Sequence, residues 1–422
     1  MESHTYQRLP APIAAFADQQ YRLAYDLIAA VRDPETGTYA DAWRWKDPAD
    51  RARCSIAAVG VGLIALCIAH AEGWEPDAAA LATVTLRSMV GRKRDFRPER
   101  EPHTGFFRHF LNGETGETLG QCEFSTIDTA LLVAGALFAK QYFGNRELSD
   151  LADELYGSIA WEKALADTAT GSLYMVIDAD GQGARVTHPF NEYALLAWLA
   201  QLACPKDAPA AVMWEQVFAA ERVASLPHGL YHDMPVLTGP RGSAHLLSSF
   251  VHQFPFYLIH QYTVSPEYRA ELEAACAVDR RSWMEQPGVP TYIWGMGAGP
   301  SIKGYHADAV GRCPDNIASP HIVAGFLPVY PQGIFDLYDL SCRDLPFATY
   351  VNANDPEDER AFRAAYRYGL HRFRPGTRWY PAAVTIIDWS TMLYGLGAYH
   401  RGIQFFAAHN DFTPGRTPST HW

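Results

Sequence analysis

The chain has 422 residues, of which 48% are hydrophobic and only 19% charged, so it can supply a large buried core. The formal net charge is −12 and no basic stripe is present, which argues against nucleic acid and anionic membranes as partners.

The cysteines and the N-terminal residues indicate the cellular compartment and whether disulfides or zinc sites are expected. The 7 cysteines are scattered and include no Cys-x-x-Cys pair, which disfavours a zinc ribbon or a disulfide framework. The start, MESHTYQRLPAPIAAF, lacks the basic region and apolar run of a signal peptide. The most apolar segment, Ile56 to Ala69, is short for a bilayer span. We therefore expect a cytoplasmic protein without membrane contact, or a periplasmic one if a signal peptide has been removed. The sequence leaves the oligomeric state open.

Helical periodicity dominates the chain. It predicts helices at about 12–32, 54–72, 76–91, 125–143, 147–157, 189–203, 208–224, 247–263, 266–282, 319–329, 357–368 and 387–406. Some are apolar nearly all round, as at Thr129 to Phe138, and others are amphipathic, as at Glu267 to Arg280. Such alternation is typical of a buried inner ring and a half-exposed outer ring.

About a dozen helices in this alternation favour an all-α fold: a single (α/α)6-barrel domain over 1–422, with short β-hairpins and long loops at its mouth. An irregular helical bundle is the alternative. Two stretches look extended, Gly105 to Gly116 and Ser172 to Asp178. The segments 284–318 and 370–386 are long and rich in Gly, Pro and aromatic residues, as functional loops often are.

The first segment with possible chemistry is Glu123-Phe-Ser-Thr-Ile-Asp128. Ser125 or Thr126 can cap the helix that follows, with Asp128 in its first turn. By itself this is an ordinary capping arrangement. The helix is so apolar, however, that we expect it to be an inner one. Its first turn should then open into the mouth of the barrel rather than into bulk solvent.

The same arrangement returns at His188-Pro-Phe-Asn-Glu192. Pro189 suits a helix start, and Glu192 then lies in the first turn ahead of an apolar run. Favourable placement in the helix dipole is the plain interpretation. Aromatic and apolar neighbours such as Phe190 and Tyr193 would desolvate the carboxyl, which raises its pKa and keeps the proton that a general acid donates.

Several hydrogen-bonding side chains lie among aromatic residues further along. His252-Gln253 and His260 are spaced too far apart for one helical metal site, and no HExxH motif occurs, so we expect no metal. Trp294-Gly-Met-Gly-Ala-Gly-Pro300 is rich in glycine but lacks the context of a phosphate-binding loop, and we interpret it as a tight loop lining a cleft. Other residues of this segment can line the same opening: Lys303, Tyr305, His306 and Asp315.

A third carboxylate begins the last long helix. Arg378-Trp379-Tyr-Pro leads through β-branched residues to Ile387-Asp388, and an apolar run follows. A helix N-terminus stabilises an ionised carboxylate, which suits a base that activates water. The bland alternative is that Asp388 serves only as an N-cap. Three helix-start carboxylates can converge at one mouth, and a pair of carboxylates facing each other across a cleft is what cleavage of a glycosidic bond requires. The 13% aromatic residues can stack on sugar rings or fill a wide helical core.

Taken together, these segments resemble the glycoamylase-like group that contains the β-1,2-glucanases of glycoside hydrolase families 144 and 162, and the cyclisation domain of cyclic β-1,2-glucan synthases. The resemblance runs from about Asp41 to Phe405. It rests on Ser55-Ile-Ala-Ala, Gly105-Phe-Phe-Arg-His-Phe, Glu123-Phe-Ser-Thr-Ile-Asp128-Thr-Ala, Asn191-Glu192, His252-Gln253, Trp294-Gly, Asp315-Asn-Ile-Ala-Ser-Pro and Ile387-Asp388.

The resemblance implies an (α/α)6 barrel that cleaves β-1,2-glucan with inversion and needs no cofactor. It implies that Glu192 is the general acid and Asp388 the base. It further implies that Glu123 and Asp128 bind or orient sugar and water. The residues expected to bind substrate are Glu123, Asp128, Phe107, Arg108, His252, Gln253, Trp294, Tyr305, Asp315 and Trp379.

The chain departs from this pattern at three places. The run after Trp294-Gly lacks the expected Asp, Phe190 replaces a Tyr and Asn191 an Asp before Glu192, and Phe-Pro-Phe follows His252-Gln253. Each departure falls on the expected sugar-binding surface, so linkage, chain-end preference and hydrolysis versus transfer stay open. The leading hypothesis is an inverting glycoside hydrolase acting on β-1,2-glucan or its oligosaccharides. The alternatives are a transglycosylase, a non-catalytic glucan-binding protein, and epimerase or lyase chemistry.

Overall fold

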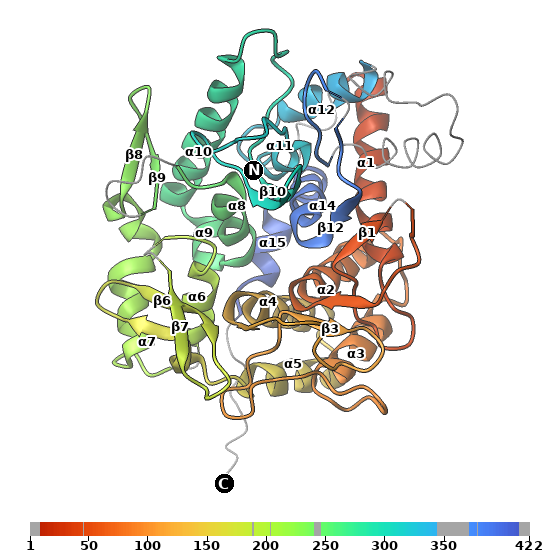
Figure 1. Ribbon diagram of the computed structural model, residues 1–422, viewed down its shortest axis with the longest axis vertical. Coiled ribbons are helices and arrows are strands. Elements are labelled where there is room, and N and C mark those ends of the chain that lie inside the picture. The colour runs from red at the N-terminus through yellow and green to blue at the C-terminus, as the bar shows by residue number, and fades with distance from the viewer. Residues whose placement is uncertain are drawn as a thin grey trace.

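The computed structural model describes residues 9–44, 46–187, 190–202, 204–239, 246–343, 371–377 and 379–412. Within these ranges the protein is predominantly helical, with small antiparallel sheets between the helices (Figure 1). No helix in this part of the chain combines the length and the apolar character needed to span a bilayer.

Six of the described helices form a ring at the centre of the molecule. They are α2 (Ile56–Ala71), α4 (Thr126–Phe143), α6 (Ala194–Leu202), α8 (Ser249–Leu258), α11 (Pro320–Gly325) and α14 (Ile386–Arg401). Each contacts the next in this order, and α14 contacts α2 (Figure 1). These helices are apolar on every side because they are enclosed on every side. In α2, for example, all residues from Ile56 to Ala69 are buried.

A second set of helices packs on the outside of this ring. It comprises α1 (Ala11–Ala30), α3 (Ala78–Met89), α5 (Arg146–Gly157), α7 (Pro209–Met213), α10 (Pro266–Met284) and α12 (Gly333–Cys342). In this order they pack on α14, α2, α4, α6, α8 and α11. They are amphipathic: α5 buries Leu148, Leu151 and Leu155 on one side. The alternation of inner and outer helices expected from the sequence is therefore present.

The short helix α15 (Gln404–His409) covers one end of the ring. It packs on α4, α8, α14 and the neighbouring α9 (His260–Val264), and Figure 1 shows it at the centre of the ring. The Phe406 ring lies 4.9 Å from that of Tyr257 and 6.0 Å from that of Phe138. Because these partners belong to the C-terminal parts of α4 and α8, α15 leaves the N-terminal ends of the helices free.

Short strands lead into the helices at this free end. The antiparallel pairs are β1 (Ala42–Arg44) with β12 (Ala383–Thr385), β2 (Arg53–Ser55) with β3 (Phe110–Asn112), β4 (Phe124–Ser125) with β6 (Ser172–Ile177), β6 with β5 (Leu165–Asp167) and β7 (Gly183–Val186), β8 (His228–Tyr231) with β9 (Met234–Leu237), and β10 (Ala298–Ser301) with β11 (Gly304–Ala307). β2, β4 and β12 run directly into α2, α4 and α14. Their pairing therefore sets where those helices begin.

Several predicted elements differ in their bounds. The predicted helix 189–203 begins only at Ala194, so Glu192 precedes the helix instead of lying in its first turn. The predicted helix 208–224 breaks into α7, a π-helical turn at Trp214–Phe218 and a 3-10 helix at Ala220–Ser225. The predicted helix 247–263 splits at Ile259, where the Thr263 hydroxyl donates to the Phe256 carbonyl.

The extended stretches are confirmed in part. β6 occupies the predicted strand at 172–178, whereas only Phe110–Asn112 is a strand within 105–116. The predicted helix 357–368 lies outside the described residues.

Glycines permit the close contact of α2 with α4. A Cβ atom added at Gly135 would lie 2.2 Å from the Gly60 carbonyl oxygen, so the two backbones would have to separate. We expect Gly135→Ala to destabilise the protein by about 1–3 kcal/mol, the usual cost of overpacking. Chemical denaturation measures this loss. Gly157→Ala is the matched control, because nothing lies within 4 Å of its added Cβ. Equal stability of the two variants would contradict the expected close contact.

Candidate active site

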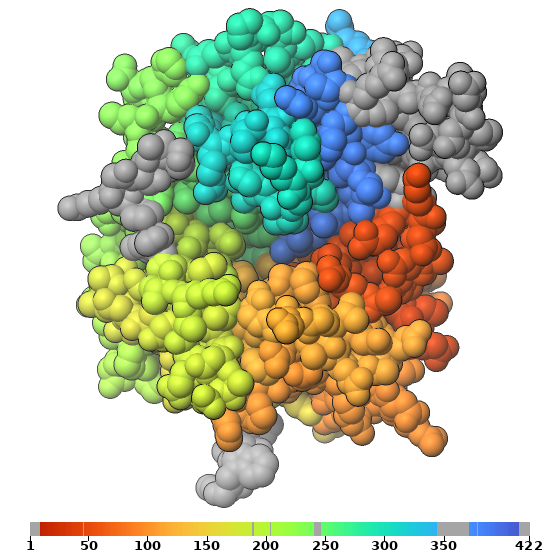
Figure 2. All heavy atoms as spheres, in the orientation of Figure 1, coloured from red at the N-terminus to blue at the C-terminus, as the bar shows by residue number. Residues whose placement is uncertain are grey.

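A cleft of about 670 Å³ opens at the end of the ring where the helices begin. Figure 2 looks onto this face, which is hollowed between the teal hairpin β10–β11, the blue start of α14 and the orange and yellow-green strands. The polar side chains that line the cleft are Asp41, Arg53, Ser55, His109, Glu123, Ser125, Asp128, Arg185, Glu192, Tyr193, Tyr305 and Thr385. Segments far apart in the sequence therefore meet at one cavity.

Glu192 lies on the wall of the cleft near the start of α6. It is half-buried in a turn between the buried residues Phe190 and Tyr193. The Asn191 side chain fixes this turn by accepting the Tyr193 backbone N–H at 2.9 Å. Burial raises the pKa of the Glu192 carboxyl to about 7, and the nearby Asp128 charge contributes in the same direction. A carboxyl with this pKa holds its proton near neutral pH and can donate it.

Asp128 occupies the first turn of α4, and His109 links it to Glu123. The Asp128 N–H donates to the Ser125 hydroxyl at 3.2 Å, the capping contact expected from the sequence. His109 Nδ1 lies 3.2 Å from Glu123 Oε1, and its Nε2 lies 3.7 Å from Asp128 Oδ2. Burial raises the pKa of Asp128 and His109 opposes this. For Glu123, a backbone hydrogen bond and His109 outweigh partial burial and lower the pKa. These groups offer hydrogen bonds to a polar ligand.

Asp388 lies immediately behind the cleft surface. It is only 4% exposed and is not itself a lining residue. The Tyr305 hydroxyl donates to Asp388 Oδ1 at 2.8 Å, and the Thr385 hydroxyl donates to Oδ2. Burial raises the pKa of Asp388 to about 6 although both hydroxyls oppose the rise. Tyr305 and Thr385 line the cleft, so one hydroxyl group separates Asp388 from a ligand.

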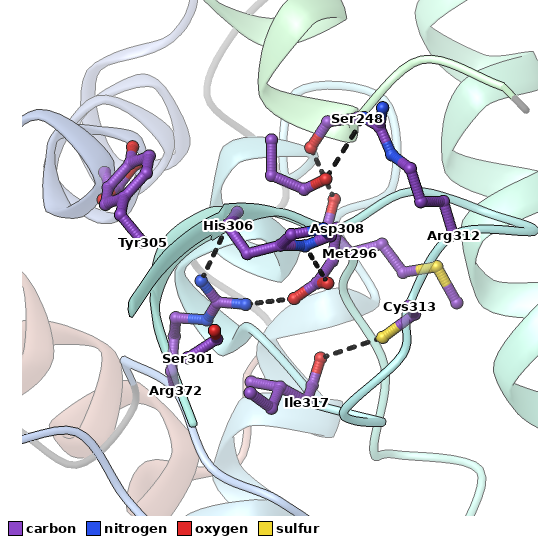
Figure 3. A network of polar contacts seen from close by, with 12 residues as sticks. Ser248, Met296, Ser301, Tyr305, His306, Asp308, Arg312, Cys313, Ile317 and Arg372 are labelled. Atoms are coloured by element: carbon purple, nitrogen blue, oxygen red, sulfur yellow. Dashed lines mark hydrogen bonds and ion pairs between the residues drawn. The ribbon is translucent and has the colours of Figure 1, made fainter. Parts of the chain in front are cut away.

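A buried ion pair supports the hairpin that carries Tyr305. Successive residues of β11 point to opposite sides, and Figure 3 shows Tyr305 directed away from its neighbour His306. His306 Nδ1 lies 2.7 Å from Asp308 Oδ1, and Arg372 forms an ion pair with Asp308 and donates to the His306 carbonyl at 3.3 Å (Figure 3). Arg372 and Asp308 are both buried, which anchors the base of the hairpin.

The glycine-rich loop before this hairpin encloses an acidic side chain of its own. The backbone N–H groups of Gly295 and Met296 donate to the Asp279 carboxylate at 3.2 and 2.7 Å, and the Ser249 hydroxyl donates to it at 2.6 Å. Burial raises the pKa of Asp279 to about 6, and these donors oppose the rise. The loop is thus tight, as expected, and Ala298 brings it to the cleft.

Four acidic residues form an electrostatically connected series. The Asp128 charge raises the pKa of both Glu192 and Asp41, and the Asp41 charge raises that of Asp388. Burial is the largest cause of each shift. Asp41, Asp128 and Glu192 line the same cleft, so their charges act on one another there. The Asp41 charge also acts on Asp388 behind the cleft surface.

Of the predicted substrate-binding residues, Glu123, Asp128 and Tyr305 line the cleft, whereas Phe107 and Arg108 do not. Phe107 is fully buried beneath the Arg100 guanidinium. Arg108 pairs with Glu99 at 2.9 Å and lies over the Phe124 ring. His109 and Phe110 face the cleft instead, and their rings stack at 3.9 Å.

Five further candidates are also absent from the lining of the cleft: His252, Gln253, Trp294, Asp315 and Trp379. His252 is buried, and burial lowers its pKa to about 3. Gln253 donates to the Ile322 carbonyl at 2.9 Å and so joins α8 to α11. Trp294 is buried and donates to Asp336 at 2.9 Å. These three side chains are enclosed in the core rather than presented to a ligand, although His252 Nδ1 and Gln253 Oε1 have no hydrogen-bond partner among the described residues.

Sequence reasoning missed Asp41, Arg53, His109, Phe110, Arg185 and Tyr193 as lining residues. His109 and Phe110 lie within the motif Gly105-Phe-Phe-Arg-His-Phe. The sequence predicted Phe107 and Arg108 from this motif instead. Asp41 carries no local signal, because the β1–β12 pairing brings it to the start of α14. Among the described residues, no group of three or more His, Cys, Asp or Glu side chains is arranged to hold a metal ion.

No protein-family model matches the sequence, and no curated protein does. Solved structures do share the fold. A Bacteroides fragilis protein provisionally named a glucoamylase has a TM-score of 0.71 at 19% identity, over 94% of this chain and 95% of that one. An endo-β-1,2-glucanase from Chitinophaga pinensis, complexed with sophorotriose and glucose, has a TM-score of 0.67 at 16% identity, over 92% and 94%.

A further similar structure is an endo-β-1,2-glucanase from Talaromyces funiculosus in complex with sophorose. Its TM-score is 0.59 at 12% identity, over 95% of this chain and 89% of that one. The resemblance to the glycoamylase-like and β-1,2-glucanase group is therefore confirmed at the level of the fold.

Proposed function

We propose that this protein is a glycoside hydrolase that cleaves β-1,2-glucan, or oligosaccharides derived from it, with inversion at the anomeric carbon. We further propose that the six ring helices and their outer partners form one (α/α)6-barrel domain over 1–422. The closed order of contacts among the ring helices and the similarity to glucanase structures support this fold.

The observation that carries the catalytic proposal is the contrast between Glu192, which lines the cleft, and Asp388, which lies behind the cleft surface. Burial disfavours the charged form of Glu192 and raises its pKa to about 7, so this carboxyl keeps its proton below that pH. Burial also raises the pKa of Asp388, but the Thr385 and Tyr305 hydroxyls and the Arg372 charge oppose the rise, so its pKa is about 6. Near pH 6.5 one carboxyl can donate a proton while the other can accept one, which is the pairing that inverting hydrolysis uses.

In the proposed reaction, Glu192 gives its proton to the glycosidic oxygen as that C–O bond breaks. A water oxygen attacks the anomeric carbon from the opposite side. The proton that this water loses passes to the Tyr305 oxygen while the Tyr305 hydroxyl proton moves to Asp388. The path follows the existing hydrogen bond from Tyr305 to Asp388 at 2.8 Å. Asp388 thus acts as the base through one hydroxyl group.

The rest of the cleft suits a neutral sugar chain. Glu123, Asp128 and His109 supply hydrogen-bonding groups for hydroxyls, and Phe110 and Phe254 supply apolar surface for sugar rings. β-1,2-Linkage is proposed from the sequence motifs and from the sophorose and sophorotriose complexes of the similar glucanases.

The pH dependence of kcat/KM should be bell-shaped. Activity requires ionised Asp388, so it should fall as pH drops through about 6, and it requires protonated Glu192, so it should fall as pH rises through about 7. Initial rates in buffers of constant ionic strength test this. A rate that keeps rising above the pKa of Glu192 would contradict the acid role of that residue.

Product analysis on linkage-defined glucans tests the function itself. The panel contains β-1,2-, β-1,3-, β-1,4- and α-1,4-glucans, and mass spectrometry identifies the products. We expect shortened β-1,2-oligosaccharides that have gained one water for each bond cut. Lengthened or cyclic products would indicate transfer instead, and binding of β-1,2-glucan without products would indicate a non-catalytic protein.

A further inference from the structure

Asp41 is held at the junction of three segments that build the cleft. Its backbone N–H donates to the Arg53 carbonyl at 2.8 Å, and its carbonyl accepts the Ile386 N–H at 2.9 Å. The residue lies directly before β1, whose partner strand β12 leads into α14. The backbone therefore ties Asp41 to both β2 and the first residue of the helix that carries Asp388.

The Asp41 side chain is free to meet a ligand. It lines the cleft and is half-buried, and no hydrogen bond or ion pair of its carboxylate occurs within the described residues. Asp388 differs, because hydroxyl groups occupy both of its oxygens. Asp41 is thus the carboxylate beside the Tyr305–Asp388 pair that has unused acceptor capacity facing the cavity.

The surroundings of Asp41 govern its charge. Burial raises the pKa of Asp41, as does the Asp128 charge, whereas His109, Arg53 and Arg44 lower it. Burial is the largest cause that raises the pKa of Tyr305 and of Asp388, and the Asp41 charge acts on both in the same direction. Asp41 therefore lies close enough to the proposed proton path to act on it electrostatically.

We propose that Asp41 is a further catalytic residue, whose carboxylate accepts the hydrogen of the attacking water that is not transferred and so directs the water oxygen at the anomeric carbon. The inference rests on the proposed hydrolysis. One water hydrogen stays bonded to oxygen and points at Asp41. The other moves to the Tyr305 oxygen as the Tyr305 proton moves to Asp388. The new C–O bond forms as the glycosidic bond breaks and its oxygen takes the Glu192 proton.

A role in maintaining the fold is disfavoured by the same contacts. The backbone N–H and carbonyl hold the segment in place, and both remain when the side chain becomes an amide. Asp41→Asn should therefore fold like the wild type. It removes the charge, and it can turn an N–H donor toward the water where an acceptor is needed.

The experiment measures kcat, KM and the pH profile of Asp41→Asn on β-1,2-glucan. We expect kcat to fall by about 10²-fold, as misdirection of a reactant can cost, with KM changed by less than about threefold. We also expect the acidic limb to move to lower pH, because Asp388 loses the neighbouring charge that raises its pKa. Asp41→Glu retains the charge, so it should lower kcat while leaving that limb in place.

Asp47→Asn is the matched control, because Asp47 is exposed in the loop after β1. It should retain wild-type kinetics. An Asp41→Asn variant with kcat within twofold of wild type, or with an unmoved acidic limb, overturns the role of Asp41 while an inactive Glu192→Gln variant leaves the hydrolase proposal standing. A wild-type protein that cleaves no β-glucan overturns both proposals.

Discussion

The Glu192→Gln variant is expected to hydrolyse β-1,2-glucan about 10³-fold more slowly than the wild type, within the range for loss of a general acid. Glutamine matches the shape of Glu192 but has no proton to give to the departing sugar oxygen. Because Glu192 contributes to the fold only as one half-buried side chain in a turn, the thermal unfolding midpoint should stay close to that of the wild type. Initial rates and thermal unfolding measure the two effects.

A substrate with a better leaving group identifies the acid role. On an aryl β-sophoroside the phenolate departs with little help, so the loss in Glu192→Gln should shrink to about tenfold. Glu114→Gln serves as the control, since Glu114 is exposed in the turn after β3. An equal loss on both substrates would show that Glu192 binds sugar rather than protonating it.

The second large effect is expected for Asp388→Asn, which should lower kcat by about 10²–10⁴-fold because the amide cannot accept the proton lost by water. Tyr305→Phe should lower kcat to within about tenfold of that level, since it removes the path to Asp388. Thr385→Val removes the other hydroxyl contact of Asp388 but leaves the path intact. It should therefore retain most of the activity.

The comparison of these variants decides whether Asp388 works through Tyr305. Rates of all three are measured at one pH near 6.5, with KM determined for each. If Tyr305→Phe retained wild-type kcat while Asp388→Asn was inactive, water would reach Asp388 by another route. If Asp388→Asn itself retained wild-type kcat, Asp388 would serve only to begin α14.

The helical ring and the positions of its carboxylates were predictable, because both follow from local pattern. Apolar runs such as Ile56 to Ala69 indicate helices enclosed on all sides, and the structure buries them so. Asp128 and Asp388 begin apolar helices and lie at the same end of the ring. Glu192 was placed near the cleft, although its helix begins later than expected because the Asn191 side chain stabilises a turn there.

The choice of residues within the motifs was not predictable. Around the start of β3, Phe107 is buried in the core and Arg108 pairs with Glu99, whereas His109 and Phe110 reach the cleft. An aromatic run without polar alternation does not indicate which residues face inward. His252 and Trp294 are residue types that bind sugars, but both are buried in the core, where Trp294 donates to Asp336. Asp41 needed the pairing of β1 with β12, a contact between distant segments.

Proton NMR of the first sugar released from β-1,2-glucan tests most directly whether Glu192 and the Asp388 side of the cleft act from opposite faces of the scissile bond. Inversion predicts that the new reducing end appears first as the α-anomer and only later equilibrates with the β-anomer. Initial appearance of the β-anomer would contradict it, because retention requires one carboxylate to bond to the sugar where the present proposal places a water.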